Sequence, residues 1–363
     1  MKSNFKNARI LIAELVHSND RKSLMRILIE ALQLSIINRT GPAYYFSRHL
    51  YQKEQTNIWD YVPNRIMYSL SDHFNEKNPS QILNNKLFYG LFFEQFKINV
   101  PKILMYNHKK TFVIGDKPVE INTLEELRKI LEDLSLNKST SNSVFIKKTY
   151  DSHGGSNTYR LDGNKKPWDQ KYLANLYEEV IRTSYLFQDT IQQHPDMDIL
   201  NPSCINTIRL DTFTDPNGRP EVMSGYLRMS ISNLHVDNLS SGGCCVGVDL
   251  LTGKLKKYGY TSYSKARGKI LTAHPVTKIP FEGFQIPLFE QTRELLLKVA
   301  SLVPSLRLVG WDIAISKNGP VLVEGNCGYD ITYNDLTYGG YRNNPGFKKV
   351  LQEYQTIRKQ KVL

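Results

Sequence analysis

Apolar residues recur at intervals of three and four over residues 8–37, which is the spacing of one face of an α-helix. The series consists of Ile12, Leu15, Val16, Leu24, Ile27, Leu28 and Leu32. We expect these side chains to form the buried face of one helical run that ends at Gly41 and Pro42. Residues 43–74 are rich in Tyr and His and contain Pro63, which predicts shorter helices.

From residue 84 the pattern changes to an alternation of helices and strands. Helices are predicted over residues 86–96, 123–134 and 170–182, and strands over residues 103–106, 143–148 and 185–188. Thr123, followed three residues later by Glu126, is typical of a capped helix start. From residue 206 onward, short apolar runs alternate with turns, as at residues 215–218 and 252–253, which predicts an antiparallel sheet. The expected fold class is α+β.

Composition excludes several classes of protein. A chain of 363 residues with 40% hydrophobic and 11% aromatic content is expected to fold into two or three lobes rather than stay disordered. The longest apolar stretch, residues 26–37, contains Glu30 and Gln33 and is shorter than the ~20 residues of a membrane span. The first residues lack the apolar run of a secretory signal, so we expect a cytoplasmic protein.

The cysteine spacing and the charge balance narrow the choice further. Cys204, Cys244, Cys245 and Cys327 show no C-x-x-C spacing, so we expect reduced thiols and no zinc site. The net charge of +12 fits a nucleic acid, an anionic membrane surface or a phosphate-rich substrate, and it is also typical of an ordinary solvated surface. No interleaved basic and aromatic motif is present, so we expect no nucleic-acid partner.

Acidic residues stand among apolar neighbours in the hairpin predicted over residues 309–326. Because side chains alternate along a strand, Glu324 and Asn326 point to the same side. A two-residue loop at residues 318–319 would pair Asp312 with Gly325, and a three-residue loop at residues 317–319 pairs it with Glu324.

We predict the three-residue loop, with Gly319 in the left-handed conformation and Pro320 as the first residue of its strand. Asp312, Glu324 and Asn326 then form an oxygen-rich site that suits Mg²⁺, which usually bridges protein carboxylates to substrate phosphates and so implies a nucleotide. Alternatively, the hairpin carries ordinary exposed polar residues.

The chain has neither a P-loop nor a Rossmann glycine motif. A strand over residues 145–148 that ends in lysine is followed by the Gly-rich segment 151–157. Such an arrangement places a cation and backbone N–H groups around a triphosphate, although it is also typical of an ordinary turn.

Taken in order, these features resemble the ATP-grasp superfamily, in which two α+β lobes clamp ATP. The similar segments are residues 84–104, 145–157, 185–191 and the hairpin. Residues 206–213, 236–254 and 273–287 resemble most the sugar-transfer-associated group, which occurs in bacterial capsule and O-antigen gene clusters. The resemblance implies an ATP-grasp fold with an N-terminal helical extension. The implied divisions are an N-terminal helical region (1–83), an α/β linker subdomain (84–142), a nucleotide-binding lobe (143–200) and a C-terminal lobe (201–363).

The resemblance also implies the site residues. ATP contacts are expected from Lys86, from Lys147 with Lys148 as the alternative in register, from the loop residues His153, Gly154, Gly155 and Ser156, and from the adenine hinge at Gln188, Asp189 and Ile191. Substrate contacts are expected from His235, Asp237, Asn238, Ser241, Gly242 and His274, and Mg²⁺ ligands from Asp312, Glu324 and Asn326.

Two arginines on predicted strands are the expected catalytic residues. Arg209 and Arg228 stand among apolar neighbours, where an arginine usually holds a carboxylate or phosphate in a bidentate manner. An ion pair with Asp211 or Asp237 is the alternative for Arg209. In the D-alanine–D-alanine ligases that the chain resembles, an arginine stands two residues before the first metal aspartate, whereas here that position is Gly310. We expect Arg209 to supply the missing charge.

The implied activity is that of an ATP-dependent carboxylate–amine ligase, which forms an amide through an acyl phosphate. The expected substrates are an amino acid or amine and a sugar acid or other carboxylate for a surface polysaccharide, with a nucleotide-linked or lipid-linked sugar also open. A kinase with His153, His194, His235 or His274 as base or phosphoryl carrier is the alternative, and a basic binding protein with a degenerate fold is a third. A peripheral place at the inner face of the membrane also stays open.

Overall fold

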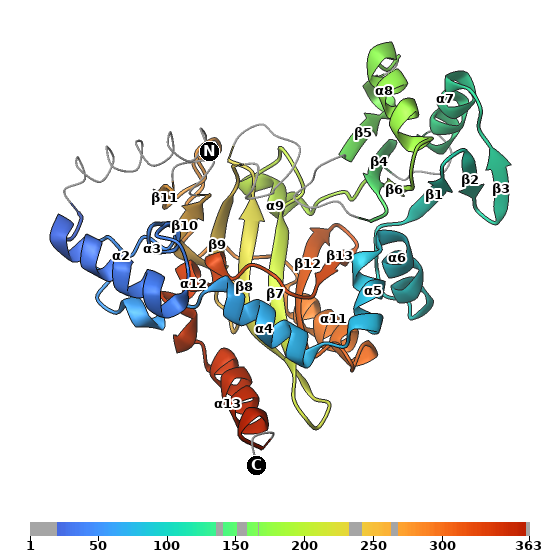
Figure 1. Cartoon of the computed structure of the whole chain (residues 1–363). Coiled ribbons are helices and arrows are strands. Elements are labelled where there is room, and N and C mark those ends of the chain that lie inside the picture. The colour runs from blue at the N-terminus through green and yellow to red at the C-terminus, as the bar shows by residue number, and fades with distance from the viewer. Residues whose placement is uncertain are drawn as a thin grey trace.

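The chain folds into two antiparallel sheets with helices packed around them, as the computed structural model shows (Figure 1). The structure describes residues 20–135, 141–150, 158–165, 167–231, 242–262 and 268–360. The first sheet has the strand order β3-β2-β1-β6-β4-β5, and the second has the order β11-β10-β9-β8-β7-β12-β13. The predicted α+β class is confirmed.

The six-stranded sheet forms a lobe of its own, at the upper right of Figure 1. Its strands are β1 (Ile103–His108), β2 (Thr111–Ile114), β3 (Lys117–Glu120), β4 (Ser143–Lys148), β5 (Thr158–Asp162) and β6 (Tyr185–Asp189). Helices α7 (Leu124–Asp133) and α8 (Gln170–Val180) share one hydrophobic core with one face of this sheet. The predicted segments 84–142 and 143–200 both supply strands to it, because β1 pairs with β6.

Local signals account for much of this lobe. Thr123 and Glu126 form the predicted capping box, in which each side chain accepts a hydrogen bond from the other residue's backbone N–H. The strand predicted over residues 143–148 is β4. The hairpin of β2 and β3 was not predicted from the sequence, and β3 is exposed along its whole length.

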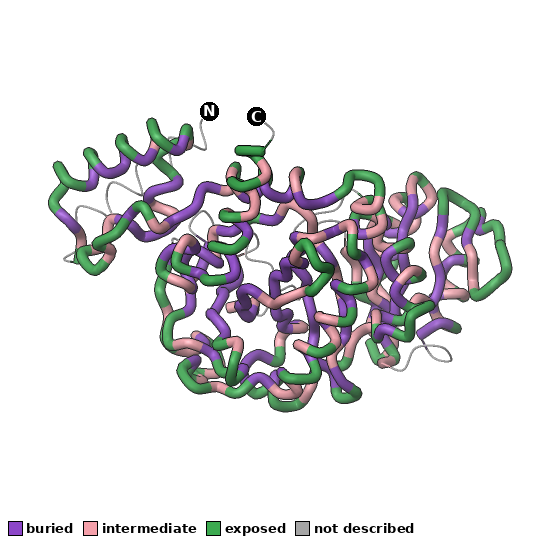
Figure 2. Tube along the Cα trace, turned by 90° about the horizontal axis from the view of Figure 1, so that it is seen from below, coloured by how far each residue is buried: buried purple, intermediate pink, exposed green. Residues whose placement is uncertain are grey.

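The seven-stranded sheet has one apolar face and one mixed face. Its strands are β7 (Thr207–Thr214), β8 (Pro220–Met229), β9 (Cys244–Val248), β10 (Leu255–Thr261), β11 (Ile270–Leu271), β12 (Leu308–Ser316) and β13 (Gly319–Asn326). Ile208, Leu210 and Ile313 point to the apolar face, where α11 (Phe289–Leu302) and α6 (Lys86–Gln95) join the core. Figure 2 shows long buried runs through the middle of the molecule. Cys204, Cys244 and Cys245 are buried and Cys327 is partly buried, and all four thiols are free, as expected.

Among the described residues, α12 (Thr332–Tyr338) contacts β8 and β9 on the opposite face of this sheet, and further helices cover that face at one end of the strands. There Phe213 and Leu308 pack against α4 (Asn64–Phe74) and α13 (Pro345–Gln360). Further along the same strands, the residues on this face are charged or polar. The candidate site lies on this uncovered part of the sheet.

The N-terminal region is a series of helices, as predicted, and it is attached to the second sheet through α12 (Thr332–Tyr338). The described helices of this region are α2 (Leu24–Asn38), α3 (Ala43–Ser47), α4 and α5 (Lys77–Asn84), with a short 3₁₀ turn at Ile58–Asp60. Arg48 donates a 3.2 Å hydrogen bond from Nε to Oδ2 of the buried Asp335, whose carboxylate also accepts from the backbone N–H groups of Val62 and Tyr341. Burial raises the pKa of Asp335 to about 6, although Arg48 opposes that shift.

The prediction of the buried face of the first helix is confirmed for Ile27 and wrong for Leu24, Leu28 and Leu32. Leu24, Leu28 and Leu32 are exposed, and Ile27, Ala31 and Leu34 are buried against residues of α3 and the segment that follows. Residues 20–23 are not helical, since Arg21 bridges to Gln52, so the predicted run over residues 8–37 is interrupted before α2. Residues 1–19 lie outside the described part of the chain. Both faces of α2 are apolar, and the three-and-four spacing cannot distinguish between them.

We predict that Asp335→Asn lowers the free energy of unfolding by about 3 to 5 kcal/mol, because it leaves Arg48 buried without its counter-charge. Urea denaturation of the two proteins measures the difference. Asp116→Asn, at an exposed turn, is the matched control and should change the free energy by less than about 0.5 kcal/mol. Equal effects of the two substitutions would contradict the role given to this ion pair.

Candidate functional site

A row of charged residues crosses the uncovered face of the seven-stranded sheet. Glu324 of β13 pairs with Asp312 of β12, and Asp312 pairs in turn with Arg209 of β7. Directly paired residues on antiparallel strands point to the same side of a sheet. The three side chains therefore lie in line across neighbouring strands.

Asp312 is held by two arginines at the centre of this row. Arg209 donates from Nε to Oδ1 at 2.6 Å and from Nη2 to Oδ2 at 3.0 Å, and Nη2 of Arg228 lies 3.1 Å from Oδ2. Burial alone would raise the pKa of Asp312, but the two arginines outweigh burial and lower it. The alternative pairing of Arg209 with Asp211 is not formed, because the direct cross-strand neighbour of Arg209 is Asp312. Asp237 lies outside the described residues.

The register of the hairpin agrees with the prediction, but its loop does not. Asp312 faces Glu324, as expected. Ser316 pairs with Gly319, so the loop has two residues, and the one-residue offset comes from a bulge between Asp312 and Ile313 in the ladder. Gly319 has φ of 122°, and Pro320 is the second residue of its strand rather than the first.

A second row of buried polar groups lies beside the first. Asp211 accepts a 2.6 Å hydrogen bond from the hydroxyl of Ser224 and a short one from the amide of Asn334, both at Oδ2. Its Oδ1 is buried and has no hydrogen-bond partner among the described residues. Burial raises the pKa of Asp211 to about 6, against the lowering effect of Arg209.

Gly310 makes room for the guanidinium of Arg209. A Cβ atom at position 310 would lie 3.1 Å from Nη1 of Arg209 and 2.9 Å from Oδ1 of Asp211. A larger residue there would displace one of these two groups. The guanidinium of Arg209, from the neighbouring strand, therefore lies directly beside Gly310.

Two lysines approach the acidic end of the row, Lys147 from the six-stranded sheet and Lys86 from α6. Nζ of Lys86, the first residue of α6, lies 3.9 Å from Oε1 of Glu324. The backbone N–H of Lys86 donates to the carbonyl of Thr149, at the end of β4, and this bond fixes the start of α6 beside the strand that carries Lys147. Burial lowers the pKa of Lys147 to about 8; Glu324 opposes this shift, and Lys86 adds to it.

Lys147 and Lys148 point to opposite sides of β4, since adjacent residues of a strand alternate. Lys147 is buried and near Glu324 and Lys86, whereas Lys148 is half-buried. Only Lys147 belongs to the side of the sheet that faces the charged row. The structure therefore favours Lys147 over its register alternative as the lysine of the site.

Two tyrosines of the site, Tyr89 and Tyr329, were not anticipated, whereas Asn326 is one of the predicted ligands. The buried hydroxyls of Tyr89 and Tyr329 and the amide nitrogen of Asn326 have no hydrogen-bond partner among the described residues. Tyr89 lies near enough to Glu324 and Asp312 for both to raise the pKa of its hydroxyl, after burial itself. Tyr89 follows Lys86 by three residues on α6, so the helical spacing is the one sequence signal that pointed to it.

The predicted hinge residues hold the edge of the six-stranded sheet together. The amide of Gln188 donates to the carbonyl of Pro101 at 3.1 Å, and Oδ1 of Asp189 accepts from the hydroxyl of Ser141 at 2.6 Å. Ile191 follows on the partly buried segment after β6. Both polar side chains are therefore occupied, which leaves the backbone of this segment as its means of contacting a ligand.

The other predicted residues either lie outside the described part of the chain or have other partners in it. His153, Gly154, Gly155, Ser156, His235, Asp237, Asn238 and Ser241 lie outside the described residues. Gly242 adopts φ of 100° at the start of the segment that leads into β9. His274 is buried, with Nε2 2.8 Å from the carbonyl of Ser230 and Nδ1 3.1 Å from the hydroxyl of Thr277, so its ring holds two segments of backbone together.

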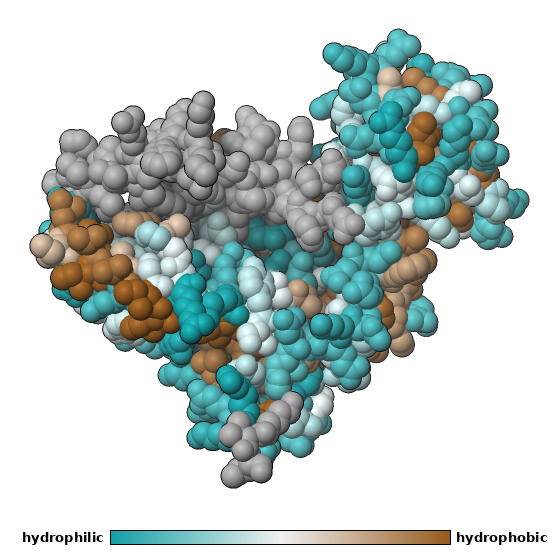
Figure 3. Space-filling model, viewed as in Figure 1, coloured by the Kyte–Doolittle hydropathy of each residue, from teal (hydrophilic) through white to brown (hydrophobic). Residues whose placement is uncertain are grey.

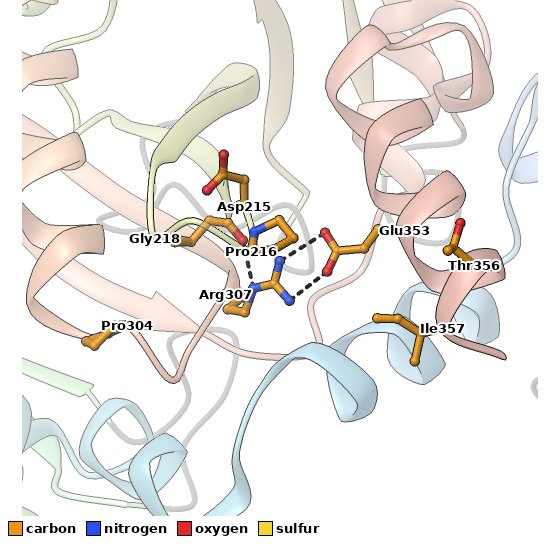
Figure 4. A pocket seen from close by; sticks show the side chains of 9 residues that line it. Asp215, Pro216, Gly218, Pro304, Arg307, Glu353, Thr356 and Ile357 are labelled. Atoms are coloured by element: carbon orange, nitrogen blue, oxygen red, sulfur yellow. Dashed lines mark hydrogen bonds and ion pairs between the residues drawn. The ribbon is translucent and has the colours of Figure 1, made fainter. Parts of the chain in front are cut away.

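The concavity drawn in Figure 4 lies elsewhere, between the turn after β7 and α13. Its one cation, Arg307, donates to both carboxylate oxygens of Glu353 at 2.8 and 3.0 Å and to the carbonyl of Thr214. These groups neutralise one another and fasten α13 to the sheet. We assign no chemistry to this concavity.

Comparison with known families agrees with the geometry. A family model described as sugar-transfer associated ATP-grasp matches residues 65–352. The chain belongs to this family. The match begins at the second residue of α4 and includes all strands of both sheets, so the ATP-grasp fold with an N-terminal helical region is the fold of this chain.

Solved structures of other ATP-grasp proteins are similar to the chain. One is D-alanyl-alanine synthetase A from Vibrio cholerae O1 biovar eltor, with 13% identity over 77% of this chain and 66% of that one and a TM-score of 0.46. Another is the D-alanine–D-alanine ligase from Bacillus anthracis, with 11% identity over 82% and 77% of the two chains and a TM-score of 0.43. The ATP-grasp ligase PsnB, complexed with a minimal precursor, Mg and ADP, has 13% identity over 72% and 55% and a TM-score of 0.38.

The chain thus spans about two thirds of the length of the synthetase and about half that of PsnB. Among proteins with curated descriptions, none matches this sequence. In the part of the chain that the structure describes, no helix combines the length and hydrophobicity that crossing a membrane requires.

The predicted magnesium ligands of this ATP-grasp chain fit a cation unequally. The side chain of Glu324 is 35% exposed and is therefore available. Asn326 would bind a cation through its amide oxygen, while its buried amide nitrogen has no hydrogen-bond partner among the described residues. Asp312 accepts three hydrogen bonds from arginines, which leaves about one of its four lone-pair sites. The set fits a hard cation held by Glu324 and Asn326, with Asp312 shared between the cation and the arginines.

We predict that Asp211→Asn flattens the pH dependence of stability between about pH 4 and 6. The pKa of Asp211 is raised from 3.8 to about 6, so the folded state binds this proton more tightly. The stability that comes from the tighter binding of this proton is fully present below pH 4 and is lost as the pH rises to 6. The slope of the unfolding free energy against pH should therefore become less negative by up to about 1.4 kcal/mol per pH unit in the variant. Denaturant titrations across this pH range measure the slope, and an unchanged slope would contradict the raised pKa.

Proposed function

We propose that the protein is an ATP-dependent carboxylate–amine ligase, with Mg-ATP bound between the two sheets. The observation that carries the proposal is the convergence of Lys86 and Lys147 on the Glu324 end of the charged row. A triphosphate with its divalent cation presents negative oxygens to lysines and a cation to carboxylates at the same place. Family membership supports the same ligand.

The proposed reaction begins with the poor reactivity of a carboxylate, whose oxygen is a bad leaving group at neutral pH. Attack of the substrate carboxylate on the γ-phosphoryl group of ATP releases ADP and gives an acyl phosphate. The amine substrate then attacks the acyl carbon, the C–O bond to phosphate breaks, and the amine loses a proton as amide and inorganic phosphate form. When bound, Mg²⁺ neutralises charge on the phosphoryl group during transfer.

Each residue of the site has a place in this scheme. Lys86 and Lys147 hold the phosphates on the side of the six-stranded sheet, and the buried position of Lys147 lets its charge act with little screening by water. Arg209 uses Nε and Nη2 on Asp312, which leaves Nη1, beside Gly310, to stabilise the developing oxyanion. Arg228 fixes the second oxygen of Asp312 while it also donates from Nε to the hydroxyl of Thr207 at 3.0 Å.

The substrate class follows from the family's association with sugar transfer. We propose that one substrate is an amino acid or amine and that the other is a sugar acid or related carboxylate for a surface polysaccharide. Phosphoryl transfer to a sugar or amino acid, without ligation, is the alternative outcome of the same site. Of the histidines that this alternative needs, the two described ones have structural contacts. His274 binds the backbone carbonyl of Ser230, and His194 accepts a hydrogen bond from the N–H of Asp196 at the start of α9 (Pro195–Leu200).

Product analysis decides between ligation and phosphorylation. Purified protein, incubated with Mg-ATP and pooled amino acids and uronic acids, should yield ADP, phosphate and a new amide mass that depends on both pools. Mass spectrometry of the mixture is the measurement. A stable phosphorylated small molecule that forms without an amine would show that the site is a kinase site.

We predict that Glu324→Gln lowers ATP turnover on the order of a hundredfold or more without loss of the fold, because it removes charge from the cation site. The matched control is Glu282→Gln, at an exposed turn of the same lobe, which should retain turnover within about twofold. Phosphate release and circular dichroism measure activity and folding. Unchanged ATP turnover in Glu324→Gln would contradict the assignment of the cation to this site.

We predict that Lys147→Met raises the KM for ATP about tenfold or more, whereas Lys148→Met changes it by less than about twofold. The two lysines are neighbours on β4, and each substitution removes one positive charge. A difference between the two variants therefore reports which side of the strand faces ATP, and not the loss of charge itself. Steady-state kinetics in ATP measure both variants. The reverse ranking would assign the phosphate contact to Lys148.

A further inference from the structure

Helix α2 carries an apolar face that the described part of the chain leaves exposed. Its inner residues Ile27, Ala31 and Leu34 are buried against a cluster that includes Tyr45 and Leu50. Its outer side chains are also apolar and are between 47% and 67% exposed: Leu24, Met25, Leu28, Ile29, Leu32, Ile36 and Ile37. Figure 3 shows these apolar residues as the brown surface over α2, at the left of the molecule. By comparison, α6 exposes Phe88 and Leu91.

The exposed residues form a continuous stripe. At 100° per residue, Leu24, Leu28, Leu32, Met25, Ile36 and Ile29 follow one another within an arc of about 140° of the helix circumference. Within that arc, Ser35 is the one polar residue. A contiguous stripe of this kind on a protein surface marks a place of contact rather than scattered exposure.

Positive charge borders the stripe, and no acidic side chain is exposed on α2. The one acid of the helix, Glu30, is buried, and it accepts 2.7 Å hydrogen bonds from Lys22 and from Arg26. Arg26 is half exposed on the outer surface, and Arg39 caps the C-terminal end of the helix. The chain as a whole has a net charge of +12.

We propose that the outer face of α2 lies on an anionic lipid surface, with its apolar stripe inserted among the acyl chains and its arginines at the level of the headgroups. Apolar side chains on one face of a helix with arginines beside them are the pattern of interfacial helices. An anionic membrane attracts a protein of this charge, whereas a second copy of the same chain would be repelled. The charge of the chain therefore favours lipid over self-association.

The proposal is independent of the catalytic assignment, because α2 shares no residue with the candidate site. It does place the site of a sugar-transfer associated enzyme near a membrane surface. The N-terminal region that holds α2 is joined to α12 through Arg48 and Asp335, and the neighbouring Asn334 contacts Asp211. The region and the candidate site are thus parts of one packed body.

Vesicle sedimentation of the full chain tests the proposal. We expect binding to vesicles of equal parts phosphatidylglycerol and phosphatidylcholine, and weaker binding to phosphatidylcholine alone or at high salt. Leu28→Glu together with Leu32→Glu should lower the partition coefficient by about tenfold or more. The matched control is Leu251→Glu together with Val276→Glu. Both side chains are apolar, they are 88% and 55% exposed, and they lie in loops of the seven-stranded sheet; this variant should bind as the unaltered chain does.

A second readout separates lost contact from lost folding. Leu32→Trp, in an otherwise unaltered chain, should shift its fluorescence emission to shorter wavelength on the mixed vesicles, as its ring enters an apolar medium. No vesicle binding by the full chain, or equal binding by both double variants, would overturn the proposal. A dimer in analytical ultracentrifugation that Leu28→Glu with Leu32→Glu abolishes, with no vesicle binding, would overturn it in favour of a second copy.

Discussion

The buried pair of Arg209 and Asp312 is the interaction on which the rest of the candidate site depends. Both groups lose hydration on burial; the bidentate contact compensates each of them, and Arg228 adds a further contact to Asp312. Removal of either partner would leave an uncompensated charge inside the sheet. The pair also places the neighbouring acidic groups. Glu324 lies beside Asp312 on β13, and Asp211 lies two residues after Arg209 on the same face of β7.

The other lobe completes the site through backbone contacts as much as through charge. The hydrogen bond from the N–H of Lys86 to the carbonyl of Thr149 joins α6 to β4, and α6 also packs through Phe93 against Trp311 on the apolar face of the second sheet. Helix α6 therefore connects the two sheets and carries Lys86 and Tyr89 to the acidic end of the row. In the proposed function, this arrangement places Lys86 and Lys147 at the phosphates without a P-loop.

Local sequence signals predicted the parts whose structure depends on near neighbours. The capping box at Thr123 and the strand over residues 143–148 depend on short-range spacing and were correct. The pairing of Asp312 with Glu324 was also correct, but it arises from a two-residue loop and a bulge rather than from the predicted three-residue loop. The bulge in the hairpin was missed because a three-residue loop without a bulge gives the same pairing of Asp312 with Glu324 as a two-residue loop with one. The arginine partners of Asp312 come from strands about a hundred residues away in sequence, and only the pairing of β7 with β12 reveals them.

The apolar pattern of α2 predicted a helix but only part of its buried face, because a helix that is apolar on both sides offers no contrast. Tyr89 and Asp211 could not be identified from their neighbours in sequence, since their unpartnered polar atoms become apparent only in the folded chain.

The central claim is that the two sheets share one Mg-ATP site. Its most direct test is the electron density of crystals grown with Mg²⁺ and a non-hydrolysable ATP analogue. The account predicts phosphates between Lys147 and Glu324, with a cation on Glu324 and Asn326; phosphate density elsewhere would contradict it.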